Sequence, residues 1–362
     1  MARLMAVLIA AQRLRNQRIS RPQRCEPVDV VQRLGAVQAQ EYSAAKWAIA
    51  LRMSGTTRDE EIERAFDEGK ILRTHVLRPT WHFVSPADIR WMLELTAPHV
   101  QRRTATYYRR HGLDQKTLTR ATLAIERALS DGQFLSRAEL AAGLRRVGLE
   151  LGSFPLMLLM MHTELEGVTC SGPRRRKQHT YGLLALRVPA APPLSRDEAL
   201  ATLTRRFFAS HGPATVRDFV WWSGLATADA KRGLEINRGR SEWIDGLTYW
   251  TIGRRANAPA ANGTHLLPVY DEYLVAYRDR AAVPHHTATT VNTQPPRAAG
   301  LHHALIVGGQ VAGLWRSVRQ RRGTAVEVAT PRRLSASERS GIAEAAQRYG
   351  RFLDGPVSLA LR

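Results

Sequence analysis

Two glutamines one residue apart, Gln38 and Gln40, are the side chains whose type and spacing best fit chemistry. In an extended segment this spacing places both amides on one face of the chain. There they present carbonyl acceptors and NH2 donors to a single water molecule. Neither amide ionises, so the pair can orient a water but cannot act as a true general base. A Gln-x-Gln pair alone is more often two ordinary polar residues of a loop, and its surroundings must decide.

Other catalytic signatures are missing from the sequence. It has no Gly-rich phosphate loop, no His-Glu-x-x-His and no Cys/His metal spacing, which argues against NTPase and zinc hydrolase chemistry. Adjacent histidines at 285–286 and 302–303 lie in expected loops, where exposure is commoner than ligation. The acidic clusters at 59–61 and 271–272 look like helix-start or structural sites, not the grouped carboxylates of a two-metal nuclease. We therefore expect neither a metal nor a cofactor.

The charge of the chain indicates a polyanionic partner. Its 362 residues include 53 Lys and Arg against 32 Asp and Glu, a net charge of +21, and nucleic acid is the commonest partner of so basic a protein. A GC-rich genome explains the choice of Arg over Lys but not the excess of positive charge. Two cysteines are too few for a disulfide framework, and no apolar run has the length of a membrane span. We expect a monomer in the cytoplasm with no membrane contact.

The elements that must position the glutamines follow from periodicity and capping residues. Helices are predicted at 2–16 and 27–34, from just after Gln40 to about residue 53, and at 59–66. Strand-like runs at 71–75 and 80–84 flank an Arg-Pro turn. Several short helices closed by a two-stranded hairpin form the outline of a winged helix, with the glutamine pair at the mouth of its third helix.

This outline recurs twice along the chain. The second copy has helices at 117–129 and 155–165, a capping box at 136–139 and a hairpin at 167–186. The third has a capping box at 195–198, helices at 215–222 and 227–235, and a strand-like run at 243–252. The predicted class is α+β, with three tandem winged-helix modules at 1–112, 113–190 and 191–256. Residues 257–362 are expected to form a small β-rich part, with a barrel as one arrangement and a helix ending near 353. Residues 255–264 and 281–300 are expected to be loops or partly disordered.

Clustered cations mark candidate DNA contacts. Four successive cations at the tip of the second hairpin repel one another and suit an anion that they can meet in a groove; the alternative is a solvated charged loop. The first hairpin offers contacts to phosphate or the lining of a binding site, the alternative being a wing with exposed charges. A basic and aromatic helix offers phosphate contacts, although half of it must face the core. The expected DNA-binding residues are Arg174, Arg175, Arg176, Lys177 and Gln178 at the tip, Arg73, Arg78 and His82 on the first hairpin, and Arg109 and Arg110 on the helix.

Three tryptophans and one further basic patch have a less specific interpretation. Trp81 alternates with polar neighbours and is predicted to be in the core, as is at least one of Trp221 and Trp222. Arginines at 316–322 are as compatible with simple solvation as with contact to the DNA backbone.

Residues 34–47 with the Gln-x-Gln pair, and residues 73–82, resemble the AlkZ-like family of winged-helix DNA glycosylases. Residues 218–225, 266–274 and 313–315 match the family as well, so the resemblance spans nearly the whole chain. It implies that Gln38 and Gln40 are the catalytic residues. It also implies a monofunctional enzyme that hydrolyses the N-glycosidic bond of bulky or cross-linked N7-alkylpurines in double-stranded DNA, often for self-resistance to a DNA-alkylating natural product. The basic hairpin would probe the duplex beside the lesion.

The chemistry of such a substrate agrees with neutral amides. An N7-alkylpurine is already cationic and leaves readily, so the enzyme has only to place a water below C1′ and stabilise an oxocarbenium-like transition state. A lyase step would need an amine nucleophile, and Lys46, on a helix near the motif, is not expected to serve. The alternative from another class is a non-catalytic DNA-binding protein, either a winged-helix regulator or a protein that shields lesions.

Overall fold

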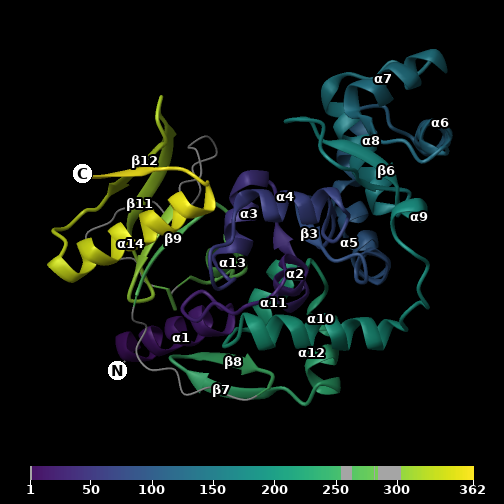
Figure 1. The fold of residues 1–362 in the computed structure, drawn as a ribbon. Coiled ribbons are helices and arrows are strands. Elements are labelled where there is room, and N and C mark those ends of the chain that lie inside the picture. The colour runs from purple at the N-terminus through teal and green to yellow at the C-terminus, as the bar shows by residue number, and fades with distance from the viewer. Residues whose placement is uncertain (1, 254–262, 281, 284–302) are drawn as a thin grey trace.

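The computed structural model describes residues 2–253, 263–280, 282–283 and 303–362 (Figure 1). Most of the two segments expected to be loops, and the histidines at 285, 286 and 302, lie outside these ranges. Within them the fold is mixed α+β with several small sheets. None of the helices in the described ranges combines the length and the apolar character that crossing a bilayer requires.

The first unit runs from α1 to α5 and carries the glutamine pair. Two of its helices have the predicted bounds, and Pro27 occupies the first turn of α2, where its missing N–H costs nothing. Its three-stranded sheet has the order β1-β3-β2. The elements are α1 (Ala2–Asn16), α2 (Pro27–Leu34), β1 (Val37–Gln38), α3 (Tyr42–Ala50), α4 (Asp59–Asp67), β2 (Leu72–His75), β3 (Trp81–Val84) and α5 (Ile89–Arg110).

The second unit, from α6 to α9, repeats this strand order as β4-β6-β5. Its predicted capping box is present, with Ser136 and Glu139 exchanging hydrogen bonds at the start of α7. The elements are α6 (Gln115–Leu129), β4 (Leu135–Ser136), α7 (Arg137–Arg146), α8 (Ser153–Leu165), β5 (Thr169–Ser171), β6 (Thr180–Leu183) and α9 (Leu184–Arg187).

The third unit pairs three helices with one hairpin, and a larger sheet completes the chain. The capping box at Ser195 and Glu198 starts α10 as predicted. The third unit comprises α10 (Arg196–Ser210), α11 (Val216–Ser223), α12 (Thr227–Ile236), β7 (Arg240–Ile244) and β8 (Leu247–Thr251). The C-terminal part comprises β9 (Thr264–Leu267), α13 (Glu272–Val275), β10 (His303–Val307), β11 (Gln310–Arg319), β12 (Thr324–Ala329), α14 (Ala336–Phe352) and β13 (Val357–Leu361).

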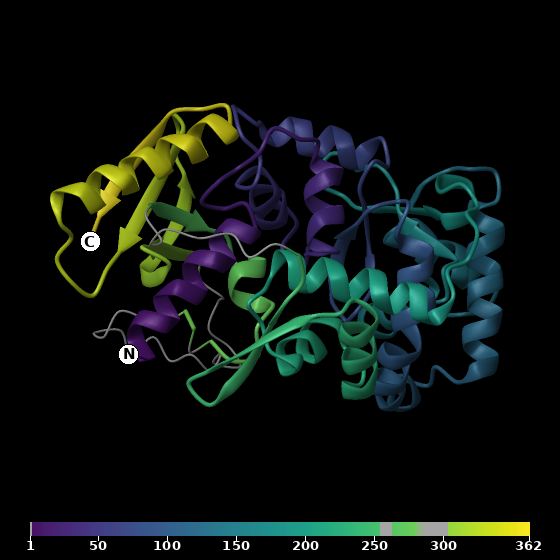
Figure 2. The same cartoon turned by 90° about the horizontal axis from the view of Figure 1, so that it is seen from below.

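The strands of the C-terminal part that the structure describes form an open sheet and not the barrel that the sequence suggested. The order of the sheet is β13-β12-β11-β10-β9, with β13 added parallel to β12 and the other pairs antiparallel. In Figure 1 α14 crosses this sheet, and α3 and α4 lie between it and the second unit. Seen from below, α1 lies between the sheet and α10 (Figure 2).

Strand β1 lies between two hydrophobic cores. Val37 and Ala39 belong to the core that α2, α3 and the C-terminal sheet share, whereas Ala36 belongs to the core built around α10 and α11. Because successive side chains of a strand point to opposite faces, Gln38 shares the face of Ala36. This short segment therefore packs against both cores.

One glycine shows how tightly the third unit meets the first. Gly224 ends α11 with φ 73°, and a Cβ added there would lie 2.3 Å from the backbone oxygen of Leu77. Gly132 has a similar φ of 79° but nothing within 4 Å of such a Cβ. The first glycine thus answers both a conformational and a packing constraint, the second only a conformational one.

We expect Gly224→Ala to lower stability much more than the control Gly132→Ala. The control pays only for the left-handed backbone, about 1 kcal/mol. Gly224→Ala must also displace the Leu77 backbone, for a total of about 3 kcal/mol. Thermal melting followed by circular dichroism measures both, and equal melting temperatures for the two variants would contradict this packing.

Candidate active site

Gln38 is held through both its backbone and its side chain. It lies in β1 opposite His82 of β3, and only 7% of its surface is exposed. Its N–H donates to Glu272 Oε1 at 2.9 Å, and its Oε1 accepts from Arg78 Nη2 at 2.8 Å. A guanidinium carries only donors, so this contact identifies the amide oxygen as the atom facing Arg78. The NH2 group and one lone pair of the oxygen remain for another partner.

Gln40 lies at the bend between β1 and α3 and is half-buried. Its Oε1 faces the Trp81 N–H at 3.4 Å, a long contact that leaves the amide largely available. The residue between the two glutamines is fixed from both sides. Ala39 N–H donates to Trp81 O at 2.7 Å, and Ala39 O accepts from Arg73 Nε at 3.0 Å. The extended segment predicted for the pair is therefore held by β3 and by an arginine of β2.

A buried carboxylate lies directly behind Gln38. Glu272, fully buried, accepts from the Gln38 N–H through Oε1 and from Trp222 Nε1 through Oε2 at 2.9 Å. The Nε2 of buried His211 is 3.4 Å from the same Oε2. Burial alone would raise the pKa of Glu272, but the nearby His211 imidazole, the charge of Arg78 and the Gln38 N–H together lower that pKa to about 2. Glu272 is therefore ionised at neutral pH.

His82 lies beneath Gln38 and is neutral. Its Nδ1–H faces Thr80 O at 2.8 Å, whereas Nε2 has no hydrogen-bond partner among the described residues. Burial, assisted by the charge of Arg78, lowers the pKa of His82 to about 3. A neutral, fully buried histidine makes no phosphate contact in this conformation. It can only line the site from within.

Arg73 is also buried, and it serves the site's framework. Its guanidinium lies over the ring of Trp81, 4.3 Å from the centroid, and His75 packs against the same ring at 4.4 Å between ring centroids. His75 pairs in turn with buried Glu164 of α8. Trp81 is half-buried in this stack, so the prediction that it lies in the core is wrong. The stack joins the first unit to the second beside Gln40.

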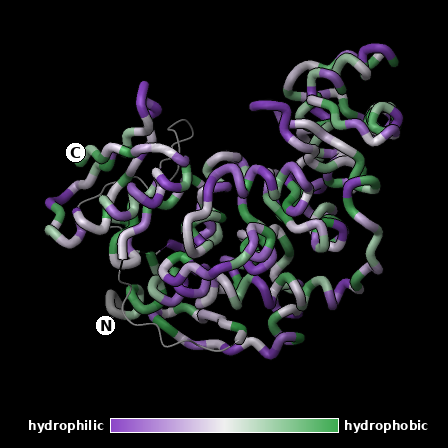
Figure 3. Tube along the Cα trace, viewed as in Figure 1, coloured by the Kyte–Doolittle hydropathy of each residue, from purple (hydrophilic) through white to green (hydrophobic). Residues whose placement is uncertain are grey.

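The cations of the second hairpin have different environments. Arg174 is largely buried: its N–H donates to Asp67 Oδ1 at 2.8 Å, and its guanidinium lies 3.3 Å from a Glu63 carboxylate oxygen. Arg175 is exposed but pairs with Glu139 at 2.8 Å. The next three residues are exposed, and we call them the hairpin tip: Arg176, Lys177 and Gln178. Their side chains make no hydrogen bond or ion pair with other described residues. The segment of the second unit that carries the hairpin tip projects from the molecule and is coloured as hydrophilic in Figure 3.

The remaining residues that the sequence singled out lie on α5 and α3. Arg109 and Arg110 are exposed on the last turn of α5, which is helical as expected and buries Tyr108. Lys46 is buried and paired with both Asp59 and Glu63.

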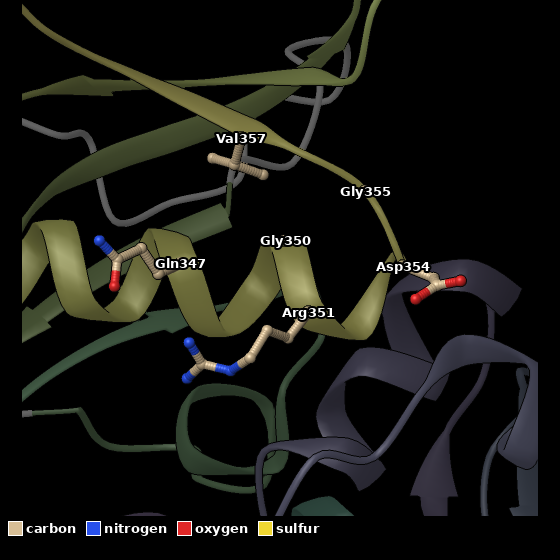
Figure 4. Close-up of a pocket in the computed structure, with 6 residues that line it drawn as sticks. All are labelled: Gln347, Gly350, Arg351, Asp354, Gly355 and Val357. Atoms are coloured by element: carbon tan, nitrogen blue, oxygen red, sulfur yellow. The ribbon is translucent and has the colours of Figure 1, made fainter.

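Other features give no competing site in the described residues. No group of three or more His, Cys, Asp or Glu in this part of the chain could hold a metal ion. A shallow pocket of about 470 Å³ lies where α14 meets β13, within the C-terminal part (Figure 4). It is lined by Gln347, Gly350, Arg351, Asp354, Gly355 and Val357.

Sequence reasoning missed three members of the site: Glu272, His211 and Trp222 as a hydrogen-bond donor. Trp222 was correctly expected in the core, where it is fully buried, while Trp221 is 47% exposed. The signal for Glu272 was the family-like segment at 266–274, but an acidic pair at a helix start is usually structural. Asp271 is such a residue, since it caps α13 and pairs with Arg52 at 2.8 Å.

Comparison with known proteins gives one consistent result. The model of the family described as "DNA glycosylase AlkZ-like" matches residues 31–352. A protein named interstrand DNA cross-link repair glycosylase, from Streptomyces sahachiroi, is 28% identical over 320 residues, 81% of this chain and 82% of that protein. The solved structure of Streptomyces sahachiroi DNA glycosylase AlkZ has the same fold, with a TM-score of 0.79, 23% identity and 99% of each chain covered.

Glu272 gives a pH-dependent prediction. Its pKa falls from an ordinary 4.5 to about 2 in the folded chain, so the stability it contributes is complete above about pH 4.5 and is lost as the pH falls toward 2. We expect Glu272→Gln to melt below wild type at neutral pH, and this difference to shrink below about pH 4.5. Melting temperatures across this range measure it. A difference that stays constant on acidification would contradict an ionised Glu272.

Proposed function

The chain belongs to the DNA glycosylase AlkZ-like family, and from that premise we propose that it hydrolyses the N-glycosidic bond of bulky or cross-linked N7-alkylpurines in duplex DNA. Gln38 and Gln40 are its catalytic residues in this proposal. The name of the Streptomyces sahachiroi relative, an interstrand DNA cross-link repair glycosylase, supports the substrate class. A role in self-resistance to a DNA-alkylating natural product would follow from such a substrate.

The observation that carries the proposal is the state of the two amides. Each has its oxygen directed toward a donor of the first hairpin, Arg78 or the Trp81 N–H, and neither NH2 group has a hydrogen-bond partner among the described residues. Two such groups, held on a segment that is itself bonded on both sides, can orient one water. Their preorganisation means that little has to be reordered when the water is placed.

Neutral amides fit a leaving group that is already cationic. Departure of an N7-alkylpurine needs no protonation, so positioning of the water at C1′ is the remaining task. An unalkylated purine is a much poorer leaving group, and an amide cannot supply the missing general-acid help. The site should therefore act on alkylated purines and spare normal DNA.

The buried state of Lys46 supports a monofunctional enzyme. Its side chain is 4% exposed, and its ammonium is 2.7 Å from Asp59 Oδ2 with Glu63 also in contact. An amine must be free and unprotonated to attack C1′. The product in this proposal is accordingly an abasic site with an intact backbone.

The DNA interface includes the hairpin tip, with Arg109 and Arg110 as further phosphate contacts. Exposure and the lack of competing carboxylates support the tip, since such cations are available for phosphates. Arg174 is the weakest candidate of the set because its guanidinium is largely buried and already pairs with Glu63.

The architecture proposed for this interface is three winged-helix modules, at 1–112, 113–190 and 191–256, before the C-terminal part at 257–362. The shared strand orders β1-β3-β2 and β4-β6-β5 support the first two modules. The third retains the helices and the hairpin β7-β8.

The catalytic assignment predicts loss of base release on removing either amide. On a duplex with one defined N7-alkylguanine, we expect Gln38→Ala and Gln40→Ala each to reduce the single-turnover rate about 100-fold, because the water is no longer placed. Release above spontaneous depurination is the measured quantity. The control Gln32→Ala, which removes an amide of α2 that contacts Ser85, should keep the wild-type rate.

The substrate panel must contain a methyl adduct and a bulky aromatic one. Silence of wild type on every adduct, with DNA binding intact, would favour a non-catalytic DNA-binding protein. Full activity of the Gln38→Ala, Gln40→Ala double variant would refute the catalytic assignment alone.

The hairpin tip predicts a salt-dependent loss of binding. Replacing Arg176 and Lys177 by Ala should weaken binding to duplex DNA and lower the slope of log Kd against log[salt] by roughly 2. The variant makes two phosphate contacts fewer, so its binding releases fewer counterions. The matched control removes two exposed arginines of the third unit, Arg196 and Arg232, which pair with Asp229 and Asp197. Equal effects of the two pairs would show only a response to net charge.

A further inference from the structure

We propose that Arg78 is a positioning residue that sets which way round the Gln38 amide stands, and that it is not a phosphate contact. The inference rests on the catalytic role proposed for Gln38. It changes the role that the sequence suggested for Arg78, from a DNA contact to a part of the catalytic framework.

The chemistry of the contact gives the amide a direction. Glutamine can occupy nearly the same volume with its oxygen and nitrogen exchanged, and a neutral donor-acceptor partner would tolerate either arrangement. Arg78 cannot accept, so its Nη2 at 2.8 Å permits only the arrangement with Oε1 toward it. The NH2 group of Gln38 must then point elsewhere, which fixes the hydrogen-bond pattern offered to a water.

The turn that carries Arg78 is built to aim it. Leu77 adopts φ 64°, a left-handed conformation that is costly for a branched residue. Arg78 N–H donates to Val76 O at 2.6 Å, and Thr80 N–H donates to Arg78 O at 2.7 Å. Pro79 adds a fixed φ between them.

Neighbouring helices lock this turn in place. Leu77 N–H donates to Thr96 Oγ1 of α5 at 3.2 Å. The Leu77 carbonyl lies against the Cα of Gly224, closely enough to exclude any side chain there. A strained turn held by both α5 and α11 costs less than it otherwise would, because the surrounding structure determines it. A turn fixed in this way suits a side chain that must keep one position. It suits less well a side chain that has to follow a mobile phosphate.

The carboxylate of Glu272 partly offsets the charge of Arg78 within the chain. Burial lowers the pKa of Arg78, while the nearby carboxylate of Glu272 acts in the opposite direction. His82 beneath it is neutral, so it adds no second positive charge. Glu272 therefore holds the backbone of Gln38 directly and supports the cation that holds its side chain.

The test separates a positioning residue from a phosphate contact. In Arg78→Met the side chain keeps its bulk but has no donor, so the Gln38 amide can rotate. We expect the single-turnover rate of base release to fall about 10- to 100-fold, as expected for a misplaced reacting group, with Kd for the duplex and its salt slope unchanged. A phosphate contact would instead weaken binding and lower the salt slope by about 0.9.

Two further variants exclude simpler explanations. Arg78→Lys restores a donor and a charge and should recover part of the rate, which a merely structural defect would not allow. Arg103→Met removes an exposed arginine whose charge acts on Arg78, and its rate at saturating protein should equal that of wild type. A loss with Arg103→Met as large as that with Arg78→Met would overturn the proposal, because it would show an effect of charge alone.

A second readout does not depend on turnover. The side-chain NH2 signals of Gln38 in an amide nitrogen–proton spectrum, identified by their loss in Gln38→Ala, should shift in Arg78→Met and remain in Arg103→Met. If wild type releases no base but these signals shift, the proposed function fails while the contact stands. If wild type is active and neither the rate nor the signals respond to Arg78→Met, the positioning role is overturned.

Discussion

The buried carboxylate of Glu272 is the contact on which the geometry of the site depends. It joins three distant segments: α13 through its own backbone, the third unit through Trp222 and His211, and β1 through the N–H of Gln38. A buried charge is costly unless it is hydrogen-bonded, so each donor is needed and none can drift far. The consequence is that β1, only two residues long and at the edge of its sheet, is held on one side by β3 and on the other by Glu272.

That restraint suits the catalytic role proposed for two weak chemical groups, Gln38 and Gln40. An amide contributes little as an acid or a base, so what it offers the reaction is position. A fixed position helps the reaction only if the entropic cost of ordering the side chain is met during folding, before the substrate binds. The hydrogen bonds of Arg73 to Ala39 O and of Arg78 to Gln38 Oε1 are made within the chain. In the proposed function the same weakness of the amides would limit hydrolysis to glycosidic bonds that are already weakened, and normal DNA would be spared.

Local signals in the sequence predicted most of the helices and few of the contacts. Pro27 and the capping boxes at Ser136 and Ser195 act within a few residues, so they could be located without a structure. Strand β13 could not, because it is defined by parallel pairing to β12, almost thirty residues before it along the chain. The pair Gln38 and Gln40 came from a motif and its surroundings, whereas Glu272 entered through a hydrogen bond spanning 234 residues. No periodicity records such a contact.

The arginines show the same division between composition and structure. A net charge of +21 correctly indicated a protein that acts on DNA, but several of the arginines make hydrogen bonds inside the fold. Arg52 is fully buried in a two-bond pair with Asp271, and Arg348 donates to three carbonyls at the end of α3. A planar group with five donors can satisfy several backbone oxygens at once, which lysine cannot do as well. Heavy use of arginine in this chain is therefore partly architectural, and the surface that can meet phosphate is smaller and more localised than the total charge suggests.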